Sequence, residues 1–395
     1  MEVVRDLNSG AELKSEFELK EEYKEYTFGL ALFDLVPVII FLMSGIIMYS
    51  SYDSPLLLAG VAATFAGGLS KVLWKMIVVL RRRDCRILTK SFRFLMFGGF
   101  GLMILSLFPR AGQGSFAGFL SAITMMPAAI FFAAGFAGMC VMGYLGAHMD
   151  NSASSNWIEE LVNTAAQTAI LIGVIIVYFG LYYHGTADAG IALRSTDQVK
   201  VTETEECYCF DGEGDGSALV FYPGAKVEAS AYAPLMMKLA ENGTDCFLCK
   251  MPLNFALLGK DKAADIQDKY QYGNWFLSGH SLGGVAASML AAGEDSAEKW
   301  DGIVFLASYP TEEMDIPALS IYGSEDKVLN HESYEEAGEK ERWPDDFSEH
   351  IIAGGNHAQF GCYGEQKGDG QAGITWQDQQ TQTAELIDRW IEAHD

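Results

Sequence analysis

The sequence has few basic residues for its length. Its 395 residues include 27 Lys and Arg against 52 Asp and Glu, which gives a formal net charge of −25. So acidic a chain repels a phosphate backbone, and we expect no nucleic-acid partner. The first 184 residues hold 14 acidic and 13 basic residues, whereas residues 185–395 hold 38 and 14. The excess negative charge therefore lies in the second part of the chain.

Several other features are missing. The first 26 residues are charged and polar and lack the pattern of a cleavable signal peptide. The chain has no internal repeat, no low-complexity tract and no transport motif. Gly98, Gly99 and Gly101 are clustered but lie in an apolar segment, which argues against a nucleotide-binding loop there.

Long apolar runs dominate the first part of the chain. They cover residues 28–49, 56–80, 92–108, 116–147 and 158–183. Runs of this length and composition are typical of helices that cross a bilayer and are rare in soluble proteins. We therefore predict a polar N-terminus (1–26), a transmembrane domain of about five helices (27–184), a linker (185–204) and a second domain (205–395).

Charged residues indicate how these runs are arranged. Asp34 lies about 9 Å from the start of the first run and Lys75 at a similar depth from the end of the second, so the two either pair or extend to the membrane surface. The loop 81–93 is strongly basic, which predicts a cytoplasmic position. Five crossings then put the N-terminus in the cytoplasm and the second domain outside it. One re-entrant run would reverse the side of the second domain.

The pattern Gly-His-Ser-Leu-Gly at 279–283 is the most informative motif. An apolar run that predicts a buried strand precedes it, and small residues that predict a helix follow it. A serine on so tight a turn needs glycine on both sides, because a Cβ there would collide with the neighbouring backbone. The helix N-terminus favours developing negative charge. Ser281 is therefore a candidate nucleophile; the alternative is a glycine-rich loop that opens a structural helix.

Two further residues follow in the order that such a serine requires. Asp326 comes in the loop after a predicted strand at 318–322, and His357 comes in the loop after a predicted last strand at 348–352. Loops at the carboxyl ends of strands are where α/β sheets carry their chemistry. Glu325 is an alternative acid. The histidines at 280, 331 and 350 are rivals to His357, although residues 280 and 350 are poorly positioned.

A glycine turn supplies candidate oxyanion donors. The predicted strand 218–222 is followed by Pro-Gly-Ala-Lys at 223–226. Backbone N–H groups at such a turn and just after the nucleophile stabilise an oxyanion in hydrolases of this type. We assign them to Ala225 and Leu282. The alternative is an ordinary turn that ends a strand.

Six stretches of the second domain match a family pattern in order. They are 221–228 (FYPGAKVE), 231–235 (AYAPL), 250–254 (KMPLN), 278–284 (SGHSLGG), 322–326 (YGSED) and 355–361 (GNHAQFG). The domain resembles the α/β-hydrolase superfamily, and more narrowly the small bacterial alpha/beta hydrolase fold-5 family. The resemblance implies a doubly wound, mostly parallel sheet and a serine hydrolase. Ala225 departs from the pattern, which has a second glycine there; this weakens the oxyanion hole only if φ must be positive.

The second domain also contains a group of cysteines. Cys207 and Cys209 lie on one predicted strand and Cys246 and Cys249 on another, and α/β-hydrolases place these two strands side by side. Outside the cytoplasm a disulfide between the pairs is possible; free buried thiols are the alternative. A zinc site is disfavoured, because Cys246 and Cys249 point to opposite faces of a strand.

These features predict a membrane-anchored serine hydrolase that cleaves an ester or related acyl bond. Ser281, His357 and Asp326 would act as nucleophile, general base and orienting acid. We expect a small-molecule or lipid-like acyl substrate and neither a metal nor an organic cofactor. Two alternatives remain: acyl transfer to a membrane or envelope acceptor, and a hydrolase fold that binds without catalysis.

Overall fold

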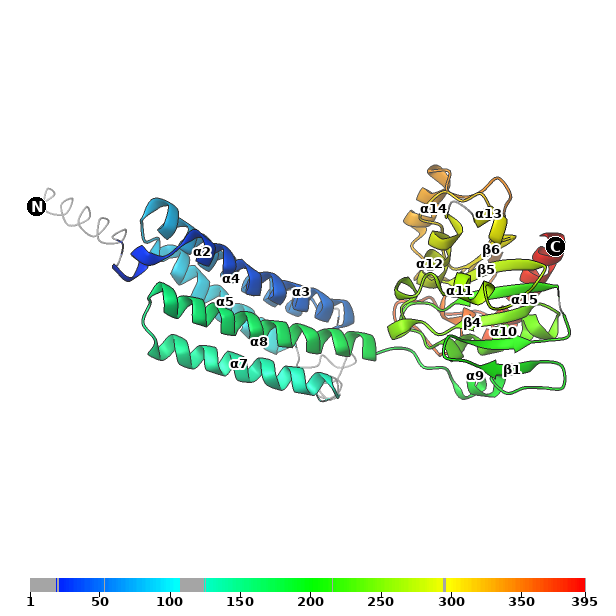
Figure 1. The fold of residues 1–395 in the computed structure, drawn as a ribbon, viewed down its shortest axis with the longest axis horizontal. Helices are drawn as coiled ribbons and strands as arrows, with labels where there is room; N and C mark the ends of the chain where they lie inside the picture. Colours follow the sequence, from blue (N-terminus) through cyan, green and yellow to red (C-terminus); the bar gives the residue numbers. More distant parts are fainter. Residues whose placement is uncertain are drawn as a thin grey trace, which may run out of the picture. The chain divides into compact units, whose positions relative to one another are not determined.

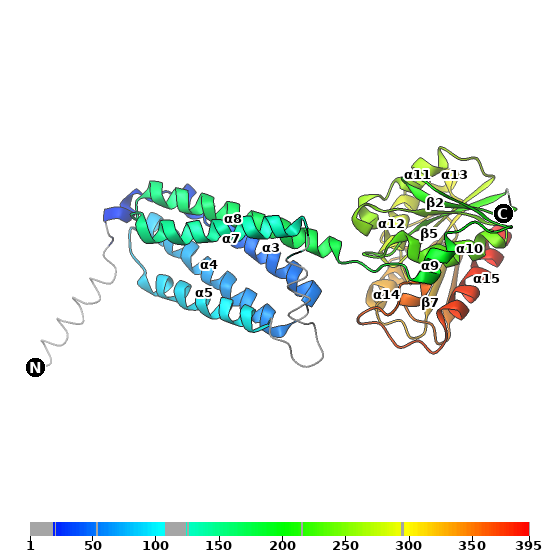
Figure 2. The ribbon, with the colours of Figure 1, turned by 90° about the horizontal axis from the view of Figure 1, so that it is seen from below.

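The computed structural model describes residues 19, 21–52, 54–106, 124, 126–214, 216–293 and 296–394. Contacts between residues divide the chain after Gly180 into a helical unit and an α/β unit. Figures 1 and 2 show the elements of each unit.

The helical unit consists of long apolar helices. They are α2 (Phe28–Phe33), α3 (Leu35–Tyr52), α4 (Pro55–Arg81), α5 (Arg86–Ser106), α7 (Ala128–His148) and α8 (Ala153–Gly180), and the short helix η1 (Glu21–Glu25) precedes them. Because α2 and α3 run on as one apolar stretch, five candidate spans result, each long and apolar enough to cross a membrane. Each of the five predicted runs thus contains a long helix, although the helix of the fifth run ends at Gly180 and that of the fourth begins at Ala128. Most of residues 107–125, and so the start of the fourth predicted run, lie outside the described residues.

Small residues let these helices approach closely. A Cβ on Gly60 of α4 would lie 2.8 Å from the carbonyl oxygen of Gly99 on α5, and a Cβ on Gly135 of α7 would lie 3.0 Å from that of Ala166 on α8. Large apolar side chains such as Phe97, which is 87% exposed, face outward. Glycine at the contacts and apolar residues outside are typical of helices packed within a bilayer.

The α/β unit is built on one sheet. Its described strands are β1 (Lys200–Glu203), β2 (Cys207–Asp211), β3 (Ser217–Tyr222), β4 (Asp245–Cys249), β5 (Asn274–His280), β6 (Gly302–Leu306), β7 (Ala318–Gly323) and β8 (Phe347–Ile352). They lie in the order β1-β2-β4-β3-β5-β6-β7-β8. The pairs β1–β2 and β2–β4 are antiparallel and the other pairs are parallel. The predicted mostly parallel sheet is confirmed.

Helices cover both faces of this sheet. The described helices of the unit are α9 (Ala187–Ala192), α10 (Ala233–Glu241), α11 (Lys262–Gln267), α12 (Leu282–Ala291), α13 (Ser296–Lys299), α14 (His331–Glu339) and α15 (Trp376–His394). Phe276 packs in one core with side chains of α10 and α15, and the next residue, Leu277, packs in a second core with side chains of α11 and α12. The strands are apolar throughout because both faces are buried.

Residues 185–204 contain a helix as well as a strand, and the cysteines of β2 and β4 are free thiols. Residues 185–204, predicted as a linker with the start of the sheet, contain α9 and β1, and Ala189 of α9 is fully buried. The predicted neighbours β2 and β4 do pair, with Cys207 opposite Cys249. The four cysteines of these strands are nevertheless free, so no disulfide joins them in the structure. Cys246 packs in the core on the other face of the sheet from Cys207, Cys209 and Cys249.

We expect Phe276→Ala to destabilise the α/β unit. The ring is fully buried, and its centroid lies 5.7 Å from that of Trp390 on α15. Its removal leaves a cavity that costs about 3–5 kcal/mol, which corresponds to roughly a 10 °C fall in melting temperature for a unit of this size. Scanning calorimetry of the full-length protein measures this. Leu258→Ala, at a 54% exposed position, should change the transition little; an equal fall in both variants contradicts the assignment.

Candidate active site

Ser281 stands on a strained turn between β5 and α12. Its backbone has φ 54° and ψ −126°, a region that side-chain-bearing residues rarely adopt. A Cβ on Gly279 would lie 2.4 Å from the carbonyl carbon of Gly283, and one on Gly283 would lie 2.1 Å from the carbonyl oxygen of Tyr222. The turn is therefore possible only with glycine at both positions, as the motif predicts.

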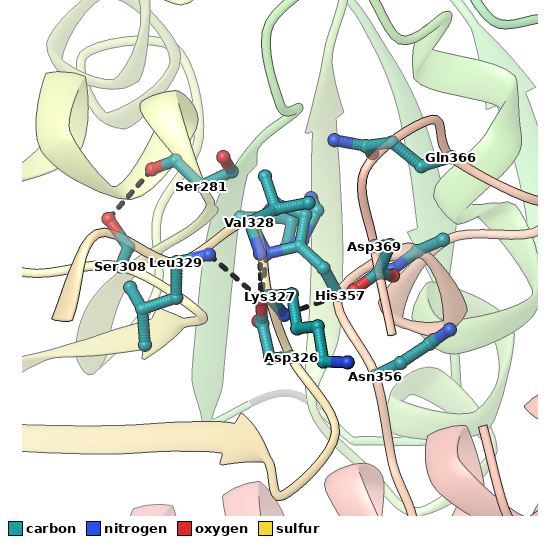
Figure 3. Close-up of polar contacts among 12 residues, drawn as sticks. Ser281, Ser308, Asp326, Lys327, Val328, Leu329, Asn356, His357, Gln366 and Asp369 are labelled. Atoms are coloured by element: carbon teal, nitrogen blue, oxygen red, sulfur yellow. Dashed lines mark hydrogen bonds and ion pairs between the residues drawn. The ribbon is translucent and has the colours of Figure 1, made fainter. Parts of the chain in front are cut away.

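Hydrogen bonds to the next strand hold this turn in place. The N–H of Ser281 donates to the carbonyl oxygen of Leu306 at 2.9 Å. The Ser308 hydroxyl donates to the carbonyl oxygen of Ser281 at 2.7 Å (Figure 3). The two bonds fix the strained residue from both sides.

Asp326 and His357 form a buried pair. The Nδ1 atom of His357 lies 2.8 Å from Oδ2 of Asp326, and both side chains are at most 1% exposed (Figure 3). The other oxygen, Oδ1, accepts the N–H groups of Val328 at 2.9 Å and Leu329 at 2.8 Å. Both carboxylate oxygens are thus satisfied, and the acid is held in one orientation against the imidazole.

Glu325, the alternative acid, occupies a different position. Its side chain is exposed and Oε1 lies 3.1 Å from the Ser324 hydroxyl. Its backbone N–H donates to the carbonyl oxygen of Gly355 at 2.8 Å. Glu325 therefore joins the two loops through its main chain and leaves the imidazole to Asp326.

The second ring nitrogen of His357 is available for chemistry. Nε2 is buried and has no hydrogen-bond partner among the described residues, so it is not bonded to the Ser281 hydroxyl in this state. Catalytic hydrogen bonds of this kind are often long before substrate binds.

Residues without a sequence motif hold the loop of His357. Gln379 of α15 is fully buried, and its amide forms two bonds to the backbone of Asn356, at 3.0 Å to the N–H and 2.8 Å to the carbonyl oxygen. Asp369 accepts the N–H of Ala358 at 2.8 Å. The peptides on both sides of His357 are therefore fixed. The sequence indicates this contact only through a glutamine on the buried stripe of an amphipathic helix.

His280 connects the serine turn with the predicted oxyanion turn. Its Nδ1 lies 2.8 Å from the Tyr232 hydroxyl, which accepts the N–H of Gly224 at 3.1 Å. Burial, with the nearby His357, lowers the pKa of His280 well below its usual range. The imidazole of His280 is therefore neutral and acts as a buried hydrogen-bonding group.

The turn after β3 differs from expectation in one detail. The positive φ belongs to Lys226, at 58°, and Ala225 has no positive φ. Alanine therefore fits where the family pattern has glycine. Leu282 is the first residue of α12, where N–H groups have no acceptor within the helix. Both predicted donors come from positions compatible with their assignment.

Other predicted or rival residues lie apart from this cluster. His331 begins α14 and His350 lies on β8, and both are exposed. Within the described ranges, no three His, Cys, Asp or Glu residues are grouped so that they could hold a metal ion.

Comparison with known proteins identifies the α/β unit. A model of the alpha/beta hydrolase family matches residues 218–381. None of the curated proteins matches the chain. The unit therefore has the α/β-hydrolase fold, and its strand order and helices agree with that assignment.

Similar solved structures align with about half of the chain. TT1662 from Thermus thermophilus is 14% identical, with 50% of this chain and 98% of that chain covered and a TM-score of 0.39. Est1E from Butyrivibrio proteoclasticus is 11% identical, with coverage of 50% and 99% and a TM-score of 0.37. A monoacylglycerol lipase from Paleococcus ferrophilus is 14% identical, with coverage of 48% and 100% and a TM-score of 0.37.

The geometry predicts that replacing Asp326 and replacing its neighbour Glu325 affect ester turnover differently. Asp326→Asn removes the charge that stabilises the imidazolium and should lower the turnover of a p-nitrophenyl ester roughly 1,000- to 10,000-fold. Glu325→Gln, the matched control, should leave turnover close to wild type because its side chain is exposed. A greater loss from Glu325→Gln than from Asp326→Asn would make the assignment of the acid wrong.

Proposed function

We propose that this chain is a membrane-anchored serine hydrolase that cleaves an ester or related acyl bond. The observation that most supports this proposal is the buried Asp326–His357 pair, whose Nδ1–Oδ2 distance is 2.8 Å and whose Nε2 is left without a partner in the described structure. The strained turn at Ser281 also supports it, because a structural helix start does not require such a backbone.

The first half of the reaction forms an acyl-enzyme. The Ser281 Oγ attacks the acyl carbonyl carbon while its proton passes to Nε2 of His357, and the negative charge of Asp326 stabilises the imidazolium that results. The carbonyl oxygen becomes an oxyanion, which the N–H groups of Ala225 and Leu282 would stabilise. The carbonyl re-forms as the bond to the leaving group breaks, and His357 protonates that group.

Water completes the second half. His357 removes a proton from a water molecule that attacks the acyl carbon. The bond between that carbon and Ser281 Oγ then breaks, His357 returns the proton to Oγ, and a carboxylic acid is released. An alcohol in place of water would give acyl transfer. Product analysis with candidate alcohols separates the two reactions, because only transfer yields a new ester.

Membrane attachment is the other part of the proposal. The five candidate spans are an odd number, so the two ends of the helical unit lie on opposite sides if all five cross. Arg82 and Arg83 lie in the connection between α4 and α5, and Arg81 and Arg86 are the helix residues on either side of it. Short basic connections stay in the cytoplasm. The α/β unit would then lie outside the cytoplasm.

Ser281→Ala should abolish labelling by a fluorophosphonate probe and lower ester turnover by several orders of magnitude. The reason is that only the activated Oγ becomes covalently bonded to the probe. Labelling of the purified full-length protein, with mass spectrometry of the labelled peptide, measures this. Ser333→Ala is the control and should label like wild type. Absence of labelling in the wild-type protein supports a binding module without catalysis.

The C-terminus should be accessible from outside intact cells. A tag placed after residue 395 should be cleaved by added protease without permeabilisation, because five crossings separate it from the cytoplasmic N-terminus. Protection of the tag until cells are permeabilised contradicts this topology.

A further inference from the structure

Four charged side chains meet inside the helical unit. The Nζ atom of Lys75 on α4 lies 2.8 Å from Oδ1 of Asp34, between α2 and α3, and 3.5 Å from Oε1 of Glu160 on α8. Lys71, one turn before Lys75, forms an ion pair with the same Glu160 oxygen. The side chains of Asp34, Lys75 and Glu160 are at most 3% exposed. Of the two predicted arrangements of Asp34 and Lys75, pairing is therefore the one observed.

A cavity of about 110 Å³ extends from this cluster into the unit. At the charged end its wall contains Asp34, Lys71 and Glu160. At the other end it contains Thr64, Gln167 and a pair of phenylalanines, Phe41 and Phe100, with ring centroids 6.2 Å apart. Because the two ends are seven or eight residues apart on each helix, the cavity is about 10 Å long. Phe and Met side chains line much of the remainder.

Polar atoms along this cavity lack adequate partners. Oδ2 of Asp34 and Oγ1 of Thr64 are buried and have no hydrogen-bond partner in the part of the chain that the structure describes. Nε2 of Gln167 has only the sulfur of Met139 at 3.8 Å. A buried carboxylate oxygen or hydroxyl without a partner costs free energy. These open atoms contribute nothing to joining the helices, so a purely structural role for the network does not account for them.

The charges and shape of the cavity define a ligand. The two lysines balance the two acids, so a charged ligand would lack a counter-charge in an apolar surrounding. The open oxygen of Asp34 requires a hydrogen-bond donor, whereas the open groups at Thr64 and Gln167 suit an acceptor such as a carbonyl. The Phe and Met walls suit a hydrocarbon chain.

We propose that the helical unit binds a neutral, single-chain amphiphile with free hydroxyls in its headgroup and a carbonyl at its linkage. A headgroup hydroxyl donates to Oδ2 of Asp34 and the carbonyl accepts from Thr64 or Gln167, so that the headgroup and the linkage fill the length of the cavity. The chain passes Phe41 and Phe100 at the far end and leaves the cavity there. All residues that line this site belong to the helical unit. It is therefore independent of whether the α/β unit hydrolyses esters.

Photo-crosslinking tests the proposal directly. The probe is a 1-monoacylglycerol with a diazirine in its acyl chain, added to the full-length protein in lipid nanodiscs; the Ser281→Ala background keeps the ester intact. After irradiation, mass spectrometry should locate adducts on cavity residues such as Phe41, Met96 and Phe100. Adducts confined to outward-facing side chains such as Phe97, which is 87% exposed, would overturn the proposal, because they report only surrounding lipid.

Matched variants distinguish the site from non-specific lipid contact. Asp34→Asn with Lys75→Gln keeps charge balance and volume and should lower cavity labelling at least tenfold. Thr64→Val keeps the shape and removes the hydroxyl, and should lower labelling at least threefold even if the double variant folds poorly. Phe97→Ala is the control and should label like the background protein. Labelling unchanged in both cavity variants contradicts the site.

Competition defines the headgroup. Unlabelled 1-monoacylglycerol should displace the probe. A fatty acid and a lysophosphatidylcholine of the same chain length should compete at least tenfold less well, because each brings a charged headgroup to a balanced cluster. Equal competition by the three amphiphiles means that the cavity recognises only the chain, and the proposal of a hydroxyl-bearing neutral ligand is then wrong.

Discussion

The close approach of three backbone segments determines the geometry of the α/β site. Strand β5, helix α12 and the end of strand β3 come so near one another that a Cβ on Gly283 would lie 2.1 Å from the carbonyl oxygen of Tyr222. The chain can pass between them only by turning sharply, and the turn puts Ser281 at φ 54°. The helix start then lies directly behind the serine, so its N–H groups lie near the place where negative charge would develop in the proposed reaction. Position, strain and electrostatics of Ser281 follow from this one packing constraint.

The adjacent residues His280 and His357 differ in the charge that the proposed reaction requires of them. His357 would carry a positive charge for part of the reaction, whereas burial keeps His280 neutral. The ring centroids of His280 and His357 are 4.4 Å apart. If both were charged they would repel each other at short range in a poorly solvated site. The pKa of His280 is lowered by its burial and by His357, so His280 would stay neutral while His357 takes up a proton in the proposed reaction. Of the two imidazoles, Asp326 contacts that of His357, through Nδ1, so its negative charge favours protonation of His357. His280 meanwhile reaches the turn of Gly224 through Tyr232.

The parts of the site that sequence could predict are those in which one short segment contains the whole physical requirement. Glycine on both sides of Ser281 is a local steric condition, and an acid and a histidine after later strands follow from the order of a parallel sheet. The clamp of Gln379 on Asn356 joins residues 23 positions apart through the docking of α15, so no local pattern contains it. The contact of Glu160 with Lys75 could not be predicted for the same reason. The similar depth of Asp34 and Lys75 in two neighbouring runs indicated that pair, but only the packing of α8 brings Glu160 to it. The free state of Cys207 and Cys249 likewise depends on side-chain directions that strand pairing does not specify.

Two buried aspartates show how differently the units treat the same chemical group. Asp326 has both oxygens occupied, one by His357 and the other by two backbone N–H groups, so its charge is held in a single orientation. Asp34 has one oxygen on Lys75 and the other without a partner among the described residues, although it is at least as inaccessible to water. A fully satisfied carboxylate is preorganised to support a neighbouring group, whereas an open one retains the capacity to bind something else. Because leaving a buried oxygen open is costly where water is scarce, the difference between Asp326 and Asp34 agrees with the two roles proposed for them, support of a catalytic histidine and binding of a ligand.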